Sequence, residues 1–123
     1  LLGYPPGMDP LYPDPATLAA RNGLTRAYLA VFQFLRQRAA TGDIVAQGIE
    51  RELTNPLLPA PTHAAVRRWL SGVVAEPRLF NRATDPYTAR DLMNHLNAAE
   101  NLNPAVWPSV YVEVVTALRG GHA

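Results

Sequence analysis

The sequence contains no cysteine and no lysine in 123 residues. Without cysteine the chain can form no disulfide, no zinc–thiolate site and no thiolate nucleophile, and this composition fits a reducing compartment. All eleven basic residues are arginine, and isoleucine occurs only at Ile44 and Ile49. Because lysine and isoleucine depend on AT-rich codons, the bias indicates a GC-rich genome rather than a functional site. Arginine nevertheless offers bidentate and stacking contacts that lysine cannot make.

Charge is scarce as well. Charged residues make up 17% of the chain, whereas about 25% is usual, and hydrophobic residues make up 48%. So little charge is typical of a domain whose surface is partly covered by partners. The formal net charge is +1, so there is no overall positive field that would hold nucleic acid.

The chain also lacks a long apolar segment. No run reaches the roughly 18 residues that a membrane-spanning helix needs. The opening Leu1-Leu2-Gly3 does not have the basic start and apolar stretch of a signal peptide. The chain does not begin with Met, and we expect it to be an ordered part of a longer polypeptide. Its length is that of one domain.

Proline is concentrated at the start of the chain, where residues 1–15 hold five of the twelve prolines. Each proline fixes φ and removes a backbone donor, so this stretch cannot form a helix or an interior strand. We expect residues 1–14 to form an extended arm and residues 15–123 a single helical domain. Two interpretations of the arm, which carries Tyr4 and Tyr12, stay open: a disordered tail, or a segment docked on a partner or on its own domain.

Beyond the arm, capping residues and glycines divide the chain into helices. Asp85-Pro86, for example, places a capping carboxylate before a proline at the first helical position. Gly23, Gly42 and Gly120 stand where helices are expected to end. The predicted helical segments are 15–22, 25–40, 43–54, 62–75, 86–99 and 104–119.

The segment 25–40 has the clearest amphipathic pattern, and we expect it to be the central helix. Thr25 is expected to cap it, and Leu29 to widen its apolar stripe. Arg36 and Arg38 near its end are explained by a favourable interaction with the helix dipole. The predicted fold is all-α, a compact bundle of five to six short helices. Its expected core residues are Phe32, Leu35, Val66, Trp69, Leu70, Val110 and Val114.

The last segment is compatible with two structures. Residues 110–115 are β-branched and aromatic enough for a strand, whereas Trp107, Tyr111 and Leu118 mark one face of a helix. No hairpin signal provides a strand partner. We therefore predict a short turn over 104–107 followed by a helix from Pro108.

No catalytic or cofactor motif is recognisable. His63, His95 and His122 lie on different segments without the spacing of a metal site. Asp91 precedes His95 by four residues, which we interpret as a solvated surface pair. Neither serine lies in a nucleophile elbow, and there is no phosphate-binding loop. We expect no enzyme, no cofactor and no metal site; a small enzyme with a pocket around His63 or His95 is the rival hypothesis.

Arg67 and Arg68 suggest an alternative function. In this hypothesis the chain is a helical DNA-binding module, winged-helix or helix-turn-helix-like, whose recognition helix is formed by residues 62–74. The eight-residue connection 54–61 is longer than the roughly 3–4-residue turn of a helix-turn-helix, and no wing hairpin is evident. The other interpretation places both arginines on the solvent face of a core helix whose Trp69 points inward.

One pattern in the second half of the chain has a counterpart in a known family. The matching positions are Pro61, Thr62, His63, Val66, Glu76, Arg78, Asp85, Asn103, Val112, Val115 and Ala117. Over residues 55–118, about half of the chain, this pattern resembles the N-terminal region of the adenovirus minor capsid protein IIIa. The proline-rich arm has no counterpart there, so the chain is similar to a divergent member.

The resemblance implies an all-helical, hexon-associated cement protein on the inner capsid surface of the virion, present in multiple copies per vertex and assembled in the host nucleus. The implied partners are the major shell subunit, the vertex protein and other minor capsid proteins. The lack of a long apolar run and the net charge of +1 lead us to expect no membrane and no nucleic-acid partner. The family has no catalytic residues to carry over. Large interfaces rely on aromatic and arginine anchors. The candidate interface residues are therefore Tyr4, Tyr12, Arg67, Arg68, Arg82 and Tyr87.

Overall fold

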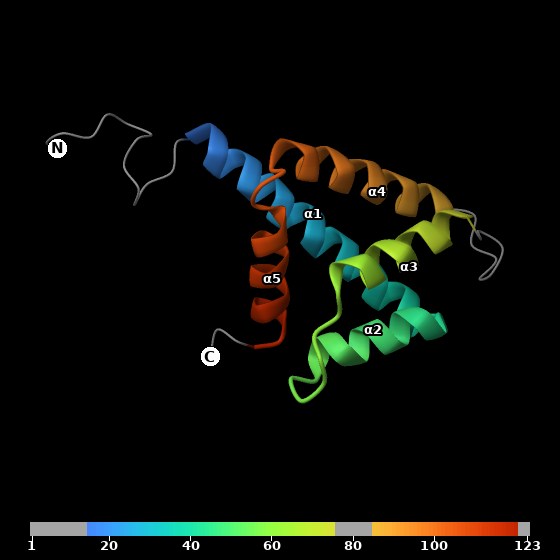
Figure 1. The fold of residues 1–123 in the computed structure, drawn as a ribbon. Coiled ribbons are helices and arrows are strands. Elements are labelled where there is room, and N and C mark those ends of the chain that lie inside the picture. Colours follow the sequence, from blue (N-terminus) through green and yellow to red (C-terminus); the bar gives the residue numbers. More distant parts are fainter. Residues whose placement is uncertain (1–14, 76–84, 121–123) are drawn as a thin grey trace, which may run out of the picture.

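Five α-helices make up the part of the chain that the computed structural model describes, residues 15–75 and 85–120 (Figure 1). They are α1 (Pro15–Ala40), α2 (Ile44–Thr54), α3 (His63–Ala75), α4 (Asp85–Leu102) and α5 (Trp107–Leu118). No strand occurs in these residues, so the predicted all-α class is confirmed. The predicted arm, residues 1–14, lies outside the described residues, and its extended form stays a prediction. None of the described helices is long and apolar enough to cross a membrane.

The longest helix, α1, is the centre of the bundle. Helices α2, α4 and α5 each pack against it, while α3 packs mainly against α4 and touches α2. Figure 1 shows α1 as a diagonal, with α4 above it and α2 and α5 below. The expectation that this segment is central is therefore confirmed, and every other helix is positioned by it directly or through one neighbour.

The prediction of two helices in place of α1 is wrong. The helix continues from Pro15 to Ala40 through Gly23, and Thr25 lies in its interior rather than at its start. A glycine inside a helix costs only about 1 kcal/mol relative to alanine. Burial of Leu24, which is 0% exposed, and of Tyr28, 2% exposed, outweighs that cost.

We expect Gly23→Ala to raise the free energy of unfolding by about 0.5–1 kcal/mol, because alanine restricts the unfolded chain and fits the helix. A Cβ at Gly23 would meet no heavy atom within 4 Å. Gly42→Ala is the matched control: φ is +106° there, so an alanine should be destabilising by about 1 kcal/mol. Urea unfolding measures both variants. If Gly23→Ala lowered the free energy of unfolding, α1 would not continue through residue 23 with unstrained helical geometry.

Most of the remaining helix ends lie within one residue of the predictions, whereas α4 extends beyond its predicted end at residue 99 to Leu102. Gly42 and Gly120 have positive φ and stand just beyond α1 and α5, as expected of glycines that end helices. Residues 104–106 form a turn, and α5 starts at Trp107 with Pro108 in its first turn. The helical interpretation of this segment is confirmed, and the strand is excluded.

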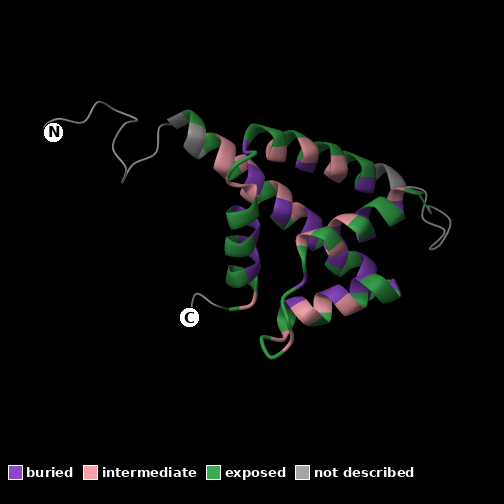
Figure 2. Ribbon diagram, in the orientation of Figure 1, coloured by how far each residue is buried: buried purple, intermediate pink, exposed green. Residues whose placement is uncertain are grey.

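The buried faces of the helices form one apolar cluster (Figure 2). All seven predicted core residues belong to it, each at most 5% exposed: Phe32, Leu35, Val66, Trp69, Leu70, Val110 and Val114. Leu29 was expected in the same stripe but is 43% exposed, because it faces an open cleft. Arg38 is buried, so the helix dipole alone does not account for it.

Candidate functional site

The structure describes the side chains of two of the six predicted interface residues. Those outside the described part of the chain are Tyr4, Tyr12, Arg82 and, on α4, the side chain of Tyr87. Their role at an interface stays a prediction. Arg67 and Arg68 both lie on α3, but their environments differ, because consecutive residues of a helix point about 100° apart.

Arg67 is engaged inside the molecule, whereas Arg68 is exposed. Nη1 of Arg67 donates to Oε1 of Glu100 at 2.9 Å, and Nη2 donates to Oδ1 of Asn97 at 2.6 Å. These bonds join α3 to α4. Arg67 is therefore bonded to α4 with its side chain 31% exposed, whereas Arg68 lies exposed on the surface of α3.

Glu100 is the centre of a polar cluster that links three helices. The Tyr28 hydroxyl donates to its Oε2 at 2.7 Å, and Nε2 of His63 lies 2.6 Å from the same oxygen. Arg67 binds the other carboxylate oxygen, and the Glu100 side chain is 11% exposed. The His63 ring also lies against Trp107 of α5, with ring centroids 4.3 Å apart. The sequence did not predict this cluster, because Tyr28 and Glu100 are 72 residues apart.

The cluster accounts for His63 without a catalytic role, because its ring is packed against Trp107 and hydrogen-bonded to Glu100. His95 and Asp91 are both exposed on α4, and His122 lies outside the described residues. Among residues 15–75 and 85–120, no group of three His, Asp or Glu side chains is placed to hold a metal ion. The Tyr28 hydroxyl in this cluster is held in its neutral form. Burial raises its pKa, and the adjacent Glu100 raises it further.

Tyr28 and Tyr111 should make the fold sensitive to alkaline pH. Burial raises the pKa of Tyr111 too, with a smaller contribution from Glu52, and its hydroxyl donates to the carbonyl of Pro61 at 2.7 Å. Stability from a raised tyrosine pKa is complete below the unfolded-state value, near 10, and falls above it because the unfolded chain ionises first.

We therefore expect the free energy of unfolding to fall above about pH 10, and Tyr28→Phe and Tyr111→Phe each to reduce that fall. Urea unfolding between about pH 8 and pH 11 measures it. If the free energy of unfolding of the double variant fell with pH as steeply as that of the wild type, the two tyrosine hydroxyls would not be the cause of the alkaline destabilisation.

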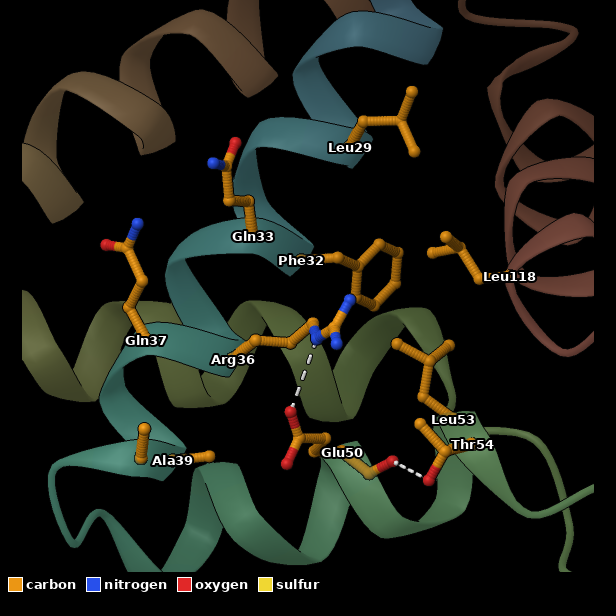
Figure 3. Close-up of a pocket in the computed structure, with 11 residues that line it drawn as sticks. Leu29, Phe32, Gln33, Arg36, Gln37, Ala39, Glu50, Leu53, Thr54 and Leu118 are labelled. Carbon is orange, nitrogen blue, oxygen red and sulfur yellow. Dashed lines mark hydrogen bonds and ion pairs between the residues drawn. The ribbon is translucent and has the colours of Figure 1, made fainter.

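An open cleft of about 930 Å³ lies between α1, α2 and the end of α5 (Figure 3). Phe32 and Leu53, each 2% exposed, form its floor. Leu29 of α1 and Leu118 of α5 point into the same space and are 43% and 39% exposed. The cleft therefore presents four large apolar side chains from three helices, two of them accessible to a partner.

The rim of this cleft is polar but electrically balanced. Nε of Arg36 lies 3.4 Å from Oε2 of Glu50, and Gln33 and Gln37 add neutral amides along α1. Because the ion pair neutralises itself, the rim provides little attraction for a charged small molecule. An apolar floor with a neutral hydrogen-bonding rim is suited to the side chains of another protein.

Comparison with known proteins adds no relative. No protein-family model matches the chain, and no curated protein and no solved structure matches it. The likeness to the adenoviral capsid protein therefore stays a prediction made from the sequence. The functional description of this chain rests on the chemistry of its surface, including the α1–α2–α5 cleft.

Proposed function

We propose that this chain is a structural interaction module whose α1–α2–α5 cleft binds an apolar face of a partner protein. The exposure of Leu29 and Leu118 above an apolar floor carries the proposal. Covering them removes apolar surface from water, which stabilises a complex by about 25 cal/mol for each Å². The floor is built by buried residues of α1 and α2, so the complementary shape exists before the partner binds.

A helix is the partner element that suits this cleft best. Helix-in-groove recognition places apolar side chains at i, i+3, i+4 and i+7 into a groove between helices. Side chains of that spacing would fill the space between Leu29 and Leu118. The amides of Gln33 and Gln37 would then remain at the wet edge of the interface, as polar groups do in protein interfaces.

The specific form of this proposal is a minor capsid protein that bridges larger shell subunits at the inner capsid surface. The resemblance over residues 55–118 points to that partner class. The all-helical fold and the low charge fraction of 17% support it, because both are compatible with a domain held between larger neighbours.

Co-sedimentation with capsid shells of the virus that encodes the chain tests this function. We expect Leu29→Asp to weaken binding about tenfold or more, because it places a carboxylate in the apolar interface. Leu57→Asp is the matched control, since Leu57 is 91% exposed and lies outside the cleft. Circular dichroism of both variants establishes that they fold.

Equal binding by the two variants would contradict the cleft. The capsid function would be contradicted if the wild-type chain did not bind capsid shells and bound duplex DNA at physiological salt. The DNA-binding alternative expects affinity that falls steeply with salt and that depends on Arg67 and Arg68. Because Arg67 also stabilises the fold, Arg68→Ala is the variant that tests DNA binding without disturbing the bundle.

A further inference from the structure

A second cleft, of about 500 Å³, lies between α2 and α3 and shares no residue with the first. Ile49, Trp69 and Val73 form its floor, each at most 6% exposed. The Trp69 indole donates from Nε1 to Oδ2 of Asp43 at 2.9 Å, which fixes the ring. The floor is therefore apolar, and the hydrogen bond to Asp43 fixes the orientation of its largest side chain, Trp69.

Glycine occurs on both walls of this cleft, Gly48 on α2 and Gly72 on α3. A Cβ at either position would meet no heavy atom within 4 Å. Packing inside the chain thus does not require glycine at these two positions. Helix propensity does not explain the glycines either, because alanine stabilises a helix more than glycine does. The missing side chains leave both helices open to close approach by another backbone.

The rims of the cleft carry one charge of each sign, Arg68 on α3 and Glu52 on α2. No ion pair joins these two side chains in the described part of the chain. The other charged residues of the lining, Arg38 and Asp43, bind each other at 3.2 Å and are buried. The accessible charge pattern is therefore one cation and one anion around an apolar centre.

We propose that two copies of the chain associate through this cleft about a two-fold axis, with Arg68 of each copy against Glu52 of the other. A two-fold interface joins the same patch on both copies, so the patch must complement itself, and one cation with one anion does so. Val45, 59% exposed at the cleft, and its neighbour Ile44, 79% exposed, provide the apolar ridge that enters the cleft of the other copy. The glycines give that ridge room.

This association does not depend on the proposed shell contact, because the two clefts have no residue in common. Sedimentation equilibrium of the 123-residue chain from about 1 μM to 1 mM tests it, since this range covers the affinities of weak dimers. We expect the wild type to dimerise. R68E and E52R alone should each weaken the dimer at least tenfold, because each places like charges against one another across the axis.

Charge exchange separates this pairing from a general loss of fold. The double variant R68E/E52R restores opposite charges and should dimerise like the wild type. An equimolar mixture of the two single variants should form a heterodimer. G48A and G72A should raise the free energy of unfolding yet weaken the dimer, a combination that misfolding cannot produce. L29D, in the first cleft, should dimerise normally.

Two outcomes would overturn the proposal. One is a wild-type chain that stays monomeric throughout the concentration range. The other is a dimer that R68E and E52R form as well as the wild type does. Neither outcome would bear on shell binding, which the Leu29→Asp variant tests separately.

Discussion

Asp43→Ala should lower the free energy of unfolding by about 3–5 kcal/mol, the largest effect that we expect from a single substitution in this chain. Asp43 is 6% exposed, and its carboxylate has three partners. It accepts from the backbone N–H of Ala46 at 3.0 Å, from Nε of Arg38 at 3.2 Å and from Nε1 of Trp69 at 2.9 Å. One side chain thus caps α2, faces a buried guanidinium and orients a core indole.

Removal of the carboxylate acts on all three at once. The buried guanidinium of Arg38 loses the carboxylate that its Nε binds, the Trp69 indole loses its acceptor, and α2 loses a cap worth about 1 kcal/mol. Urea unfolding followed by circular dichroism measures the change. Asp43→Asn, which keeps the shape and one acceptor oxygen, should fall between the wild type and alanine.

Asp91→Ala is the matched control, because Asp91 is an exposed aspartate on α4 and its loss should change stability by less than about 0.5 kcal/mol. If Asp43→Ala and Asp91→Ala destabilised the chain equally, the buried pair would not stabilise the fold. A loss of this size is a large fraction of the roughly 5–15 kcal/mol that holds a domain folded.

Leu35→Ala should lower the free energy of unfolding by about 2–5 kcal/mol. Leu35 is 0% exposed on α1, the helix against which three others pack. Truncation removes buried methyl groups and leaves a cavity that the surrounding side chains fill only in part. The spread of the expected value reflects how far the neighbouring helices can relax.

Leu57→Ala is the control for this substitution, since the same side chain is 91% exposed in the connection between α2 and α3. Its effect should lie within about 0.5 kcal/mol of zero. A small effect of Leu35→Ala with an unchanged denaturant slope would mean that α1 is not the centre of a well-packed core.

Helix α2 connects the two proposed contacts. Its residues Glu50, Leu53 and Thr54 line the first cleft, whereas Val45, Gly48, Ile49 and Glu52 line the second. A chain paired through the second cleft would still present the first to a partner. Asp43 fixes the start of this helix, so it positions both surfaces.

Much of the fold could be predicted because helices are encoded locally. A stripe at a period of 3.6 residues depends on neighbours within one or two turns, and the core residues from Phe32 to Val114 followed from it. Gly42 and Gly120 ended helices as expected, since each adopts a positive φ. Gly23 misled the prediction, because a glycine signals a possible helix end but tertiary packing decides whether the helix stops there.

The candidate surfaces could not be predicted in this way. Leu29 fits the apolar stripe of α1, and only the way in which α2 and α5 pack around α1 leaves it at an open cleft. Arg67 and Arg68 look alike in sequence, yet the position of α4 engages one and leaves the other in solvent. Arg38 likewise resembles a surface residue until Asp43 and Trp69 enclose it.

The sequence by itself determined the helical class, most of the helix boundaries and the core, because those depend on capping groups, glycine φ and apolar spacing within each segment. Only the tertiary structure decided which polar groups meet and where the core stays uncovered. Tyr28 and Glu100 are 72 residues apart, and their hydrogen bond exists because α1 and α4 pack side by side. Such contacts depend on the angles and distances between helices, which no local pattern encodes.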